Sequence, residues 1–307
     1  MQKLSFLISL TTGDNDYQLE QAEAAKKSAR QLGVDAEVVH ADNDAINQSQ
    51  QLLKVIQSSS GPRPNAIVLE PVGGTALPHV ARAAVAAGIG WVVLNREAEY
   101  LSELRRTARV PVFTIGSDHM EIGRIQGRQF SALVPQGGVV LYIQGPSDSS
   151  AAKQRTMGMS ETKPENIQIS MLKAQWTEAS AYRAVTSWLR LSTSQKAQIS
   201  LVGAQDDSMA IGARKAFQEQ TMATEQQRWL NLPFTGCDGV PKTGQAWVRS
   251  GVLAATVVVP PNAGLALEML VKAIQTGAQP SEQTLTKPSS FPQVESLSAG
   301  KAQKQFS

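Results

Sequence analysis

Polar and charged side chains stand directly after apolar, strand-like runs at several places in the chain. The run Trp91–Leu94 stops at Asn95 and Arg96, and neither residue continues an apolar pattern. Because parallel strands end at one edge of their sheet, residues that follow different strands can meet around a ligand. The other strand-end residues, or residues in the first turns beyond a strand, are Asp14, Tyr17, Ser117, Asp118, His119, Gln144, Asp148, Arg155, Trp176, Asp206, Asp207 and Asp238.

These residue types suit the recognition of a small molecule that carries many hydroxyl groups. Carboxylates accept hydrogen bonds, a guanidinium group donates from a fixed fork, and an asparagine amide does both. A hydroxyl group is both donor and acceptor, so the set matches a sugar-like ligand. Tyr17 and Trp176 add aromatic faces on which the apolar face of a sugar ring can stack.

Each residue taken singly has a structural alternative. An aspartate at a strand end more often caps a helix than contacts a ligand, and we favour the cap for Asp118 and Asp207. Trp176 follows a strand and Tyr17 begins a helix, so either ring can belong to the core. Asp238 lies in "GCDGV", where a carboxylate can also bond its own backbone in an Asx turn. For the set as a whole, ligand binding is the favoured interpretation.

Short apolar strands alternate with amphipathic helices along most of the chain. This alternation predicts parallel sheets covered on both faces, and hence two doubly wound α/β lobes. The expected strands are "LSFLISL", "VDAEVV", "NAIVLE", "GWVVLN", "VPVFTIGS", "GVVLYI", "IQISMLKA", "AQISLVGA" and one near "LPFTG". The expected helices cover 17–32, with Leu19, Ala22, Ala25, Ala29 and Leu32 on one face before Gly33, then 45–57, with Ile46, Leu53 and Ile56, and 75–87, 119–133, 149–160, 178–191 and 208–220.

Composition excludes several classes of function. The length of 307 residues favours two domains, and the net charge of +3 comes from scattered residues rather than from a basic block that would bind nucleic acid. The single cysteine, Cys237, allows no internal disulfide, and the three histidines lack metal-ligand spacing. We therefore expect no metal, no cofactor and no nucleic-acid partner.

The chain also lacks the motifs of common enzyme classes. Only one glycine follows the first strand, in "SLTTGDNDY", where a dinucleotide-binding fold needs G-x-G-x-x-G, and neither a phosphate-binding loop nor G-x-S-x-G occurs. Asp206 and Asp207 are adjacent and point in different directions, which argues against an acid–base pair. We expect a protein that is not an enzyme and has no catalytic residue.

The first residues, "MQKLSFLISL", can be mistaken for a signal peptide. Only Leu4 to Leu10 separate Lys3 from the turn-like "TTGDND", and no small-x-small cleavage site follows, so we interpret this stretch as a buried strand. No later stretch approaches the roughly 18 to 20 apolar residues of a membrane span, so no membrane insertion is expected.

Six segments together resemble the type I periplasmic substrate-binding proteins of ABC sugar importers, in the ribose- and galactose-binding branch, whose ligand domain is shared with LacI-type repressors. They are "VVLNREA", "TIGSDHMEIGRIQGRQF", "LYIQGPSDSSAAKQR", "QWTEASAYRAVTSWL", "GAQDDSMAIGARKAF" and "TGCDGVPKTGQAWVRSGVLAATVVVPPNAG". The resemblance places ligand contacts at Asp14, Tyr17, Asn95, Arg96, Arg155, Trp176, Asp206 and Asp238, and it places Ser117 and His119 where the first crossover meets the cleft.

The resemblance also implies an architecture and a role. The N-terminal lobe would comprise 1–117 plus 260–288, the C-terminal lobe 118–259 plus 289–307, and a three-strand hinge would let the lobes close on a sugar or polyol. A monomer would then deliver this ligand to the permease subunits of an ABC importer. Its location would be periplasmic or otherwise extracytoplasmic after removal of a signal peptide, and cytoplasmic if Met1 is the native start. The alternative is the ligand-sensing domain of a LacI-type regulator or of a sensor kinase system.

The sequence departs from the family pattern at four places, and the first two bear on the ligand. The branch usually has an amide at the place of Val259 and an asparagine at the place of Asp206. The loop "VPQGGVV" is too short and lacks the carboxylates of a calcium site. Residues 219–232 are longer than the usual link, and we expect a surface excursion there, with contact to a partner as the alternative.

Overall fold

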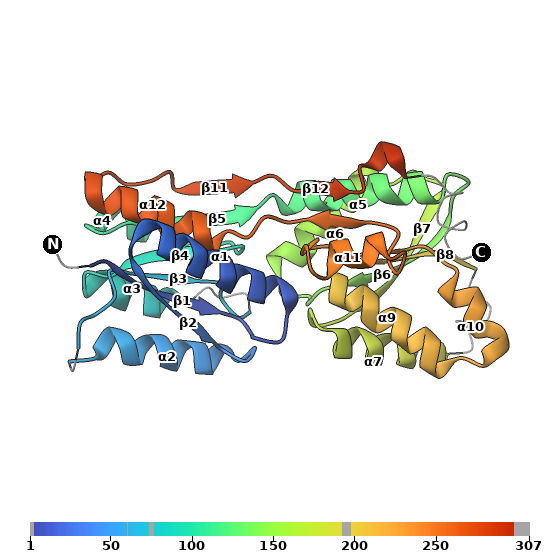
Figure 1. The fold of residues 1–307 in the computed structure, drawn as a ribbon, viewed down its shortest axis with the longest axis horizontal. Coiled ribbons are helices and arrows are strands. Elements are labelled where there is room, and N and C mark those ends of the chain that lie inside the picture. The colour runs from blue at the N-terminus through green and yellow to red at the C-terminus, as the bar shows by residue number, and fades with distance from the viewer. Residues whose placement is uncertain (1–2, 60, 74–76, 192–197, 298–307) are drawn as a thin grey trace. The chain divides into compact units, whose positions relative to one another are not determined.

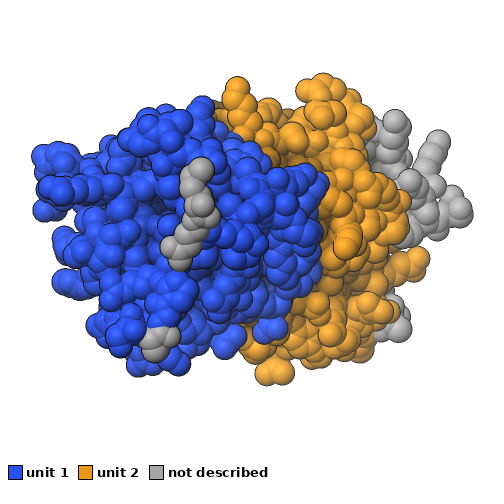
Figure 2. All heavy atoms as spheres, turned by 60° about the vertical axis from the view of Figure 1, so that its left-hand side comes forward, with its two compact units in different colours: residues 1–117, 261–286 blue, residues 118–260, 287–307 orange. Residues whose placement is uncertain are grey.

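The chain folds into two compact units, each built from separate stretches of sequence. The computed structural model describes residues 3–59, 61–73, 77–191 and 198–297. Unit 1 comprises Met1–Ser117 and Pro261–Thr286, and unit 2 comprises Asp118–Pro260 and Lys287–Ser307 (Figure 2). The chain therefore passes between units after Ser117, Pro260 and Thr286, where the sequence had suggested 117, 259 and 288. Residues 298–307 of the expected second lobe lie outside the described residues.

Unit 1 contains a six-stranded sheet in the order β11-β5-β4-β3-β1-β2, and every neighbouring pair is parallel. The prediction of a parallel, doubly wound sheet is confirmed, and "LSFLISL" supplies its strand β1 rather than a leader helix. The strands are β1 (Ser5–Leu10), β2 (Asp35–His40), β3 (Ala66–Leu69), β4 (Gly90–Leu94), β5 (Val112–Ser117) and β11 (Gln283–Thr286).

Helices cover both faces of this sheet because its side chains alternate between two apolar layers. Phe6, Ile8 and Leu10 face one layer, and Leu7 faces the other. The first layer is closed by α1 (Asp16–Leu32) and α12 (Ala263–Thr276), and the second by α2 (Ala45–Gln57), α3 (Pro78–Ala86) and α4 (Leu101–Thr107) (Figure 1).

Two apolar positions expected in the core of unit 1 are exposed instead. Leu19 is 47% exposed and Ile46 is 70% exposed, and each lies in the first turn of its helix. On α2 the buried face runs through Gln48, Leu52 and Ile56 at spacings of four, which leaves Ile46 on another side of the helix. The expected end of α1 is confirmed, because Gly33 adopts φ 69° as the left-handed cap. Helix α4 was not predicted, since its short polar sequence hides two buried leucines.

Unit 2 contains a parallel four-stranded sheet in the order β7-β6-β8-β9 and an antiparallel pair, β10-β12. The strands are β6 (Gly138–Gln144), β7 (Ile167–Lys173), β8 (Ile199–Ala204), β9 (Phe234–Thr235), β10 (Thr256–Val258) and β12 (Ser289–Phe291). Helices α5 (His119–Leu133) and α6 (Ser150–Thr162) pack on one face through Phe130 and Met159. On the other face lie α7 (Glu178–Leu189) and α9 (Asp207–Gln220). Unit 2 also contains α11 (Gly244–Arg249) and the 3-10 turn η1 (Val294–Ser296).

The stretch 219–232, expected to be a surface excursion, contains a helix anchored in the core. This helix, α10 (Ala223–Leu230), has exposed residues, but the Trp229 side chain is only 3% exposed. Its ring stacks on Phe217 with centroids 4.7 Å apart and meets Trp188 edge-on at 5.8 Å. The surface description was therefore incomplete, because one aromatic side chain fastens the segment to unit 2. No helix in the described part of the chain is long and apolar enough to span a membrane.

The anchoring of α10 gives a testable expectation. Replacing Trp229 by alanine should lower the free energy of unfolding by about 3 to 5 kcal/mol, because it removes a buried ring and leaves a cavity. Met222→Ala is the control, since this side chain is 72% exposed and surface changes shift stability by only about 0.5 kcal/mol. Urea denaturation measures both variants, and equal stabilities would show that α10 is not held by its tryptophan.

Candidate ligand-binding site

The strand ends of unit 1 bring a buried glutamate next to Asn95 and Arg96. Glu70 follows β3 and is 3% exposed. Its carboxylate accepts hydrogen bonds from Gln18 Nε2 and from Asn95 Nδ2, both at 3.1 Å, and it pairs with the Arg96 guanidinium at 3.2 Å. Arg96 Nη1 also donates to the Asn95 carbonyl oxygen at 3.0 Å. A buried carboxylate with three donors is compensated, which fixes the position of Arg96.

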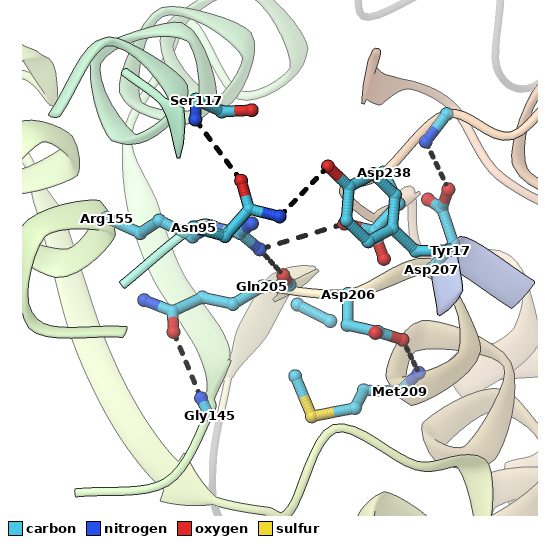
Figure 3. A network of polar contacts seen from close by, with 12 residues as sticks. Tyr17, Asn95, Ser117, Gly145, Arg155, Gln205, Asp206, Asp207, Met209 and Asp238 are labelled. Carbon is cyan, nitrogen blue, oxygen red and sulfur yellow. Dashed lines mark hydrogen bonds and ion pairs between the residues drawn. The ribbon is translucent and has the colours of Figure 1, made fainter. Parts of the chain in front are cut away.

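The Asn95 amide lies at the centre of this cluster, and Figure 3 shows it between Ser117 and Tyr17. Nδ2 donates to the Tyr17 hydroxyl at 3.3 Å as well as to Glu70. Oδ1 accepts from Asn262 Nδ2 at 2.7 Å and from the Ser117 N–H at 3.3 Å. A side-chain amide has two N–H donors and two lone pairs on its oxygen. The four contacts above use all of them.

Four of the expected site residues in unit 1 are thus brought together: Tyr17, Asn95, Arg96 and Ser117. The Tyr17 ring is 7% exposed, and its hydroxyl also accepts from Gln21 Nε2 at 3.1 Å. Asp14 lies in the loop between β1 and α1, where it is exposed and its N–H donates to the Thr12 hydroxyl. Its role as a ligand contact remains a prediction.

Close helix packing positions Arg155 in unit 2. A Cβ at Gly123 of α5 would overlap the carbonyl oxygen of Arg155, and one at Gly158 of α6 would overlap the carbonyl oxygen of Met120. Glycine at both places lets the helix backbones touch. The close approach holds α6, and with it Arg155, against α5.

The Arg155 guanidinium lies among residues that follow three strands of unit 2, β7, β8 and β9. Its side chain is 7% exposed; Nη1 donates to the Gln205 carbonyl oxygen and lies 3.9 Å from an Asp238 carboxylate oxygen (Figure 3). The Trp176 ring centroid is 5.4 Å from the guanidinium carbon, a cation–π distance. Trp176 reaches this place with φ 59°, a left-handed backbone uncommon for a bulky side chain.

Asp206 and Asp238 form a pair of buried carboxyl groups beside Arg155. Asp206 is 3% exposed and caps α9 by accepting from the Met209 N–H at 3.0 Å. Asp238 has φ 107°, a backbone region uncommon for residues other than glycine, and its side chain is 10% exposed. The Asx turn considered for this residue stays an alternative. Burial raises the pKa of Asp238 well above its usual range, the charge of Asp206 raises this pKa further, and Arg155 opposes both effects.

The cap expected at Asp207 lies one residue earlier, at Asp206, so that prediction was wrong. Asp207 instead accepts hydrogen bonds from the Gly239 N–H at 2.7 Å and from the Thr256 hydroxyl at 2.6 Å. It fastens the β9 and β10 segments to the start of α9. The cap at Asp118 is confirmed, because this side chain accepts from the Glu121 N–H at 2.9 Å.

His119 begins α5 and is 7% exposed, and its role as a ligand contact remains a prediction. Gln144 donates to the Thr156 hydroxyl at 2.8 Å, and Asp148 is exposed. Val259, at the place of the usual amide, is buried and its N–H donates to the Asp238 carbonyl oxygen at 3.0 Å. Among the residues that the structure describes, no group of three or more His, Cys, Asp and Glu side chains could hold a metal ion.

The family model described as a periplasmic binding protein domain matches residues 6–279. The chain belongs to this family. The ribose import binding protein of Salmonella typhimurium is 26% identical over 262 residues, which are 85% of this chain and 81% of that protein.

Solved structures show the same fold for this periplasmic binding protein domain. A galactofuranose-binding protein superposes with a TM-score of 0.79 at 23% identity and covers 98% of this chain and 97% of its own. The binding component of the arabinose ABC transporter from Shewanella sp. ANA-3, bound to α- and β-L-arabinofuranose, has a TM-score of 0.78 at 22% identity, with 98% and 95% covered. The type I periplasmic binding protein fold inferred from the six sequence segments is confirmed.

Three buried polar residues of these clusters were missed in the sequence. Glu70 is the last letter of "NAIVLE" and was counted with its strand, although it follows β3 as Asn95 follows β4. Gln205 follows β8 and is 0% exposed; its Nε2 donates to the Tyr142 hydroxyl at 3.0 Å. Asn262 precedes α12 and has no strand before it in the expected pattern. For Glu70 and Gln205, the strand-end position itself was the available signal.

The carboxyl pair predicts a pH dependence of stability. When the pKa of a carboxyl group is higher in the folded than in the unfolded protein, the free energy of unfolding falls as the pH rises between the two pKa values. The fall begins near the unfolded pKa, about 4, and reaches up to about 1.4 kcal/mol per pH unit. Asp206→Asn removes the like charge and keeps a good helix cap, so its free energy of unfolding should fall less steeply with pH than that of the unchanged protein.

Urea denaturation from about pH 4 to 8 measures this difference against the linkage slope. Asp44→Asn is the matched control, because Asp44 also caps a helix, α2, but is exposed. Parallel stability curves for the Asp206 variant and the unchanged protein would contradict the coupling of the two carboxyl groups.

Proposed function

We propose that this protein captures a small polyhydroxylated molecule, a sugar or polyol, between its two lobes, closes on it, and delivers it to an ABC importer. The observation that carries the proposal is that each unit ends its parallel strands in a buried guanidinium–carboxylate cluster. In unit 1 this is Arg96 with Glu70, and in unit 2 it is Arg155 with Asp238. In this proposal one ligand contacts Arg96 from the first lobe and the Arg155–Asp238 cluster from the second.

The chemistry of the unit 2 cluster suits a sugar ring. A ring stacked on Trp176 would place its hydroxyl groups near the carboxyl groups of Asp206 and Asp238, which accept from hydroxyl donors, and near the Arg155 guanidinium, which donates to hydroxyl oxygens. Asp14, Tyr17, Ser117 and His119 remain proposed contacts at the rim. The relatives named for ribose, galactofuranose and arabinose support a pentose or hexose, in furanose or pyranose form.

The proposed setting follows from the same family membership. The protein would work as an extracytoplasmic monomer that binds without chemical conversion, and permease subunits of an importer would read its closed state. A ligand that touches both lobes only when they are closed shifts the population towards closure by its differential affinity. The chain passes between units three times, and these passages would act as the hinge.

A thermal-shift screen of pentoses, hexoses, inositols and sugar acids tests the function. A true ligand at 100 times its dissociation constant adds about 2.7 kcal/mol to the free energy of unfolding. Asp238→Asn should weaken binding of that compound at least tenfold, or about 1.4 kcal/mol, because one acceptor oxygen becomes a donor. Glu165→Gln, an exposed change in unit 2, is the control. Failure of every sugar and polyol to raise the melting temperature would reject the proposal.

Closure makes a separate prediction in solution. Small-angle X-ray scattering should give a smaller radius of gyration with the compound from the screen at saturation than without it, because closure brings the lobes together. Calorimetric titration of the same sample confirms occupancy. Identical scattering at full occupancy would retain the ligand and reject closure.

A further inference from the structure

The three passages of the chain between units are joined by hydrogen bonds inside unit 1. Ser117 precedes the first passage, Asn262 lies just after the second, and Thr286 precedes the third. The Thr286 hydroxyl donates to Asn262 Oδ1 at 3.0 Å and lies 3.2 Å from the Ser117 hydroxyl. Asn262 is 0% exposed, and its N–H donates to Gln21 Oε1 at 2.8 Å.

The Asn95 amide connects this group to the strand-end cluster. On one side Nδ2 donates to Glu70, which holds Arg96; on the other side Oδ1 accepts from Asn262 and from the Ser117 N–H. Each atom of the amide is committed to protein partners, and the residue is 4% exposed. Movement of this amide would therefore leave a buried donor or acceptor without a partner, which is unfavourable.

We infer that Glu70 and Asn95 are positioning residues: Glu70 fixes Arg96, and Asn95 transmits the position of this pair to all three passages between the units. The inference rests on the proposed function for the role of Arg96 at the ligand, but the hydrogen-bonded chain itself requires no ligand. In this inference Asn95 holds other protein groups in position and does not itself contact the ligand. A ligand that pulls on Arg96 would then act on Ser117, Asn262 and Thr286 through one buried amide.

Reversal of the Glu70–Asn95 hydrogen bond tests the connection. Asn95→Asp places a second carboxylate against Glu70 and removes the donor, so the bond is lost. Glu70→Gln in the same protein supplies a donor from the other side and restores an amide–carboxylate bond of opposite direction. Rescue of this kind identifies a specific contact, because two independent disruptions would add.

Hydrogen exchange of the ligand-free protein is the measurement, read in the segments 112–117, 261–265 and 283–286. Asn95→Asp should speed exchange in all three segments by at least about tenfold, and the double variant should return it to within about threefold of the unchanged protein. Arg96→Ala should also speed exchange in all three, although Arg96 makes no described contact with Ser117, Asn262 or Thr286.

Glu121→Gln is the control, since this carboxylate pairs with Arg124 and Arg128 on α5 and lies outside the chain of bonds. If Asn95→Asp does not fold, Glu70→Gln alone serves, because it turns an acceptor towards Asn95 Nδ2 into a donor and should also speed exchange in all three segments. Faster exchange in 112–117 alone, or a double variant no better than the sum of its parts, overturns the inference. The exchange measurement uses no sugar, so its result stands even if the ligand screen fails. A negative exchange result likewise leaves the outcome of the ligand screen unchanged.

Discussion

Charge burial at the strand ends is the constraint on which the rest of this structure depends. Glu70 and Asp238 are each less than a tenth exposed, and a carboxylate in such a place is tolerated only beside a cation or several hydrogen-bond donors. Arg96 and Arg155 supply the cations. The amides of Gln18 and Asn95 lie in the core for the same reason, since both donate hydrogen bonds to the Glu70 carboxylate.

The two units meet this constraint differently. In unit 1 the Glu70 carboxylate has three donors, and every donor and acceptor of the Asn95 amide has a protein partner. Protein groups therefore satisfy both side chains. In unit 2 two buried carboxyl groups, Asp206 and Asp238, accompany one guanidinium, and Arg155 Nη1 lies 3.9 Å from an Asp238 carboxylate oxygen. Burial raises the pKa of Asp238, and the charge of Asp206 raises it further.

Sequence reasoning located strands β1 to β9 because apolar runs bounded by polar residues are a local signal, but it did not list the short strands β10, β11 and β12. It also found most strand-end residues, since their position follows from the strand. It failed where the decisive fact was a distant contact: Leu19 and Ile46 have apolar side chains but no partner layer, and Trp229 looked like part of a loop because Phe217 and Trp188 are far away in sequence. Asp207 was assigned a cap because two adjacent aspartates are indistinguishable until the helix start is known. The roles of Glu70 and Asn262 depend on neighbours that no spacing rule reveals.

The late return of the chain to unit 1 has a consequence for synthesis. Helix α12 and strand β11 come from residues 263–286, yet α12 covers Phe6, Ile8 and Leu10 in the first apolar layer. A growing chain that has released only its first lobe segment would therefore leave that layer open to water, and the 118–260 stretch of unit 2 would emerge before the layer could close. Exposed apolar surface in a partly made protein favours aggregation. Residues 263–286, which complete the layer begun by β1, are made only after residues 118–260.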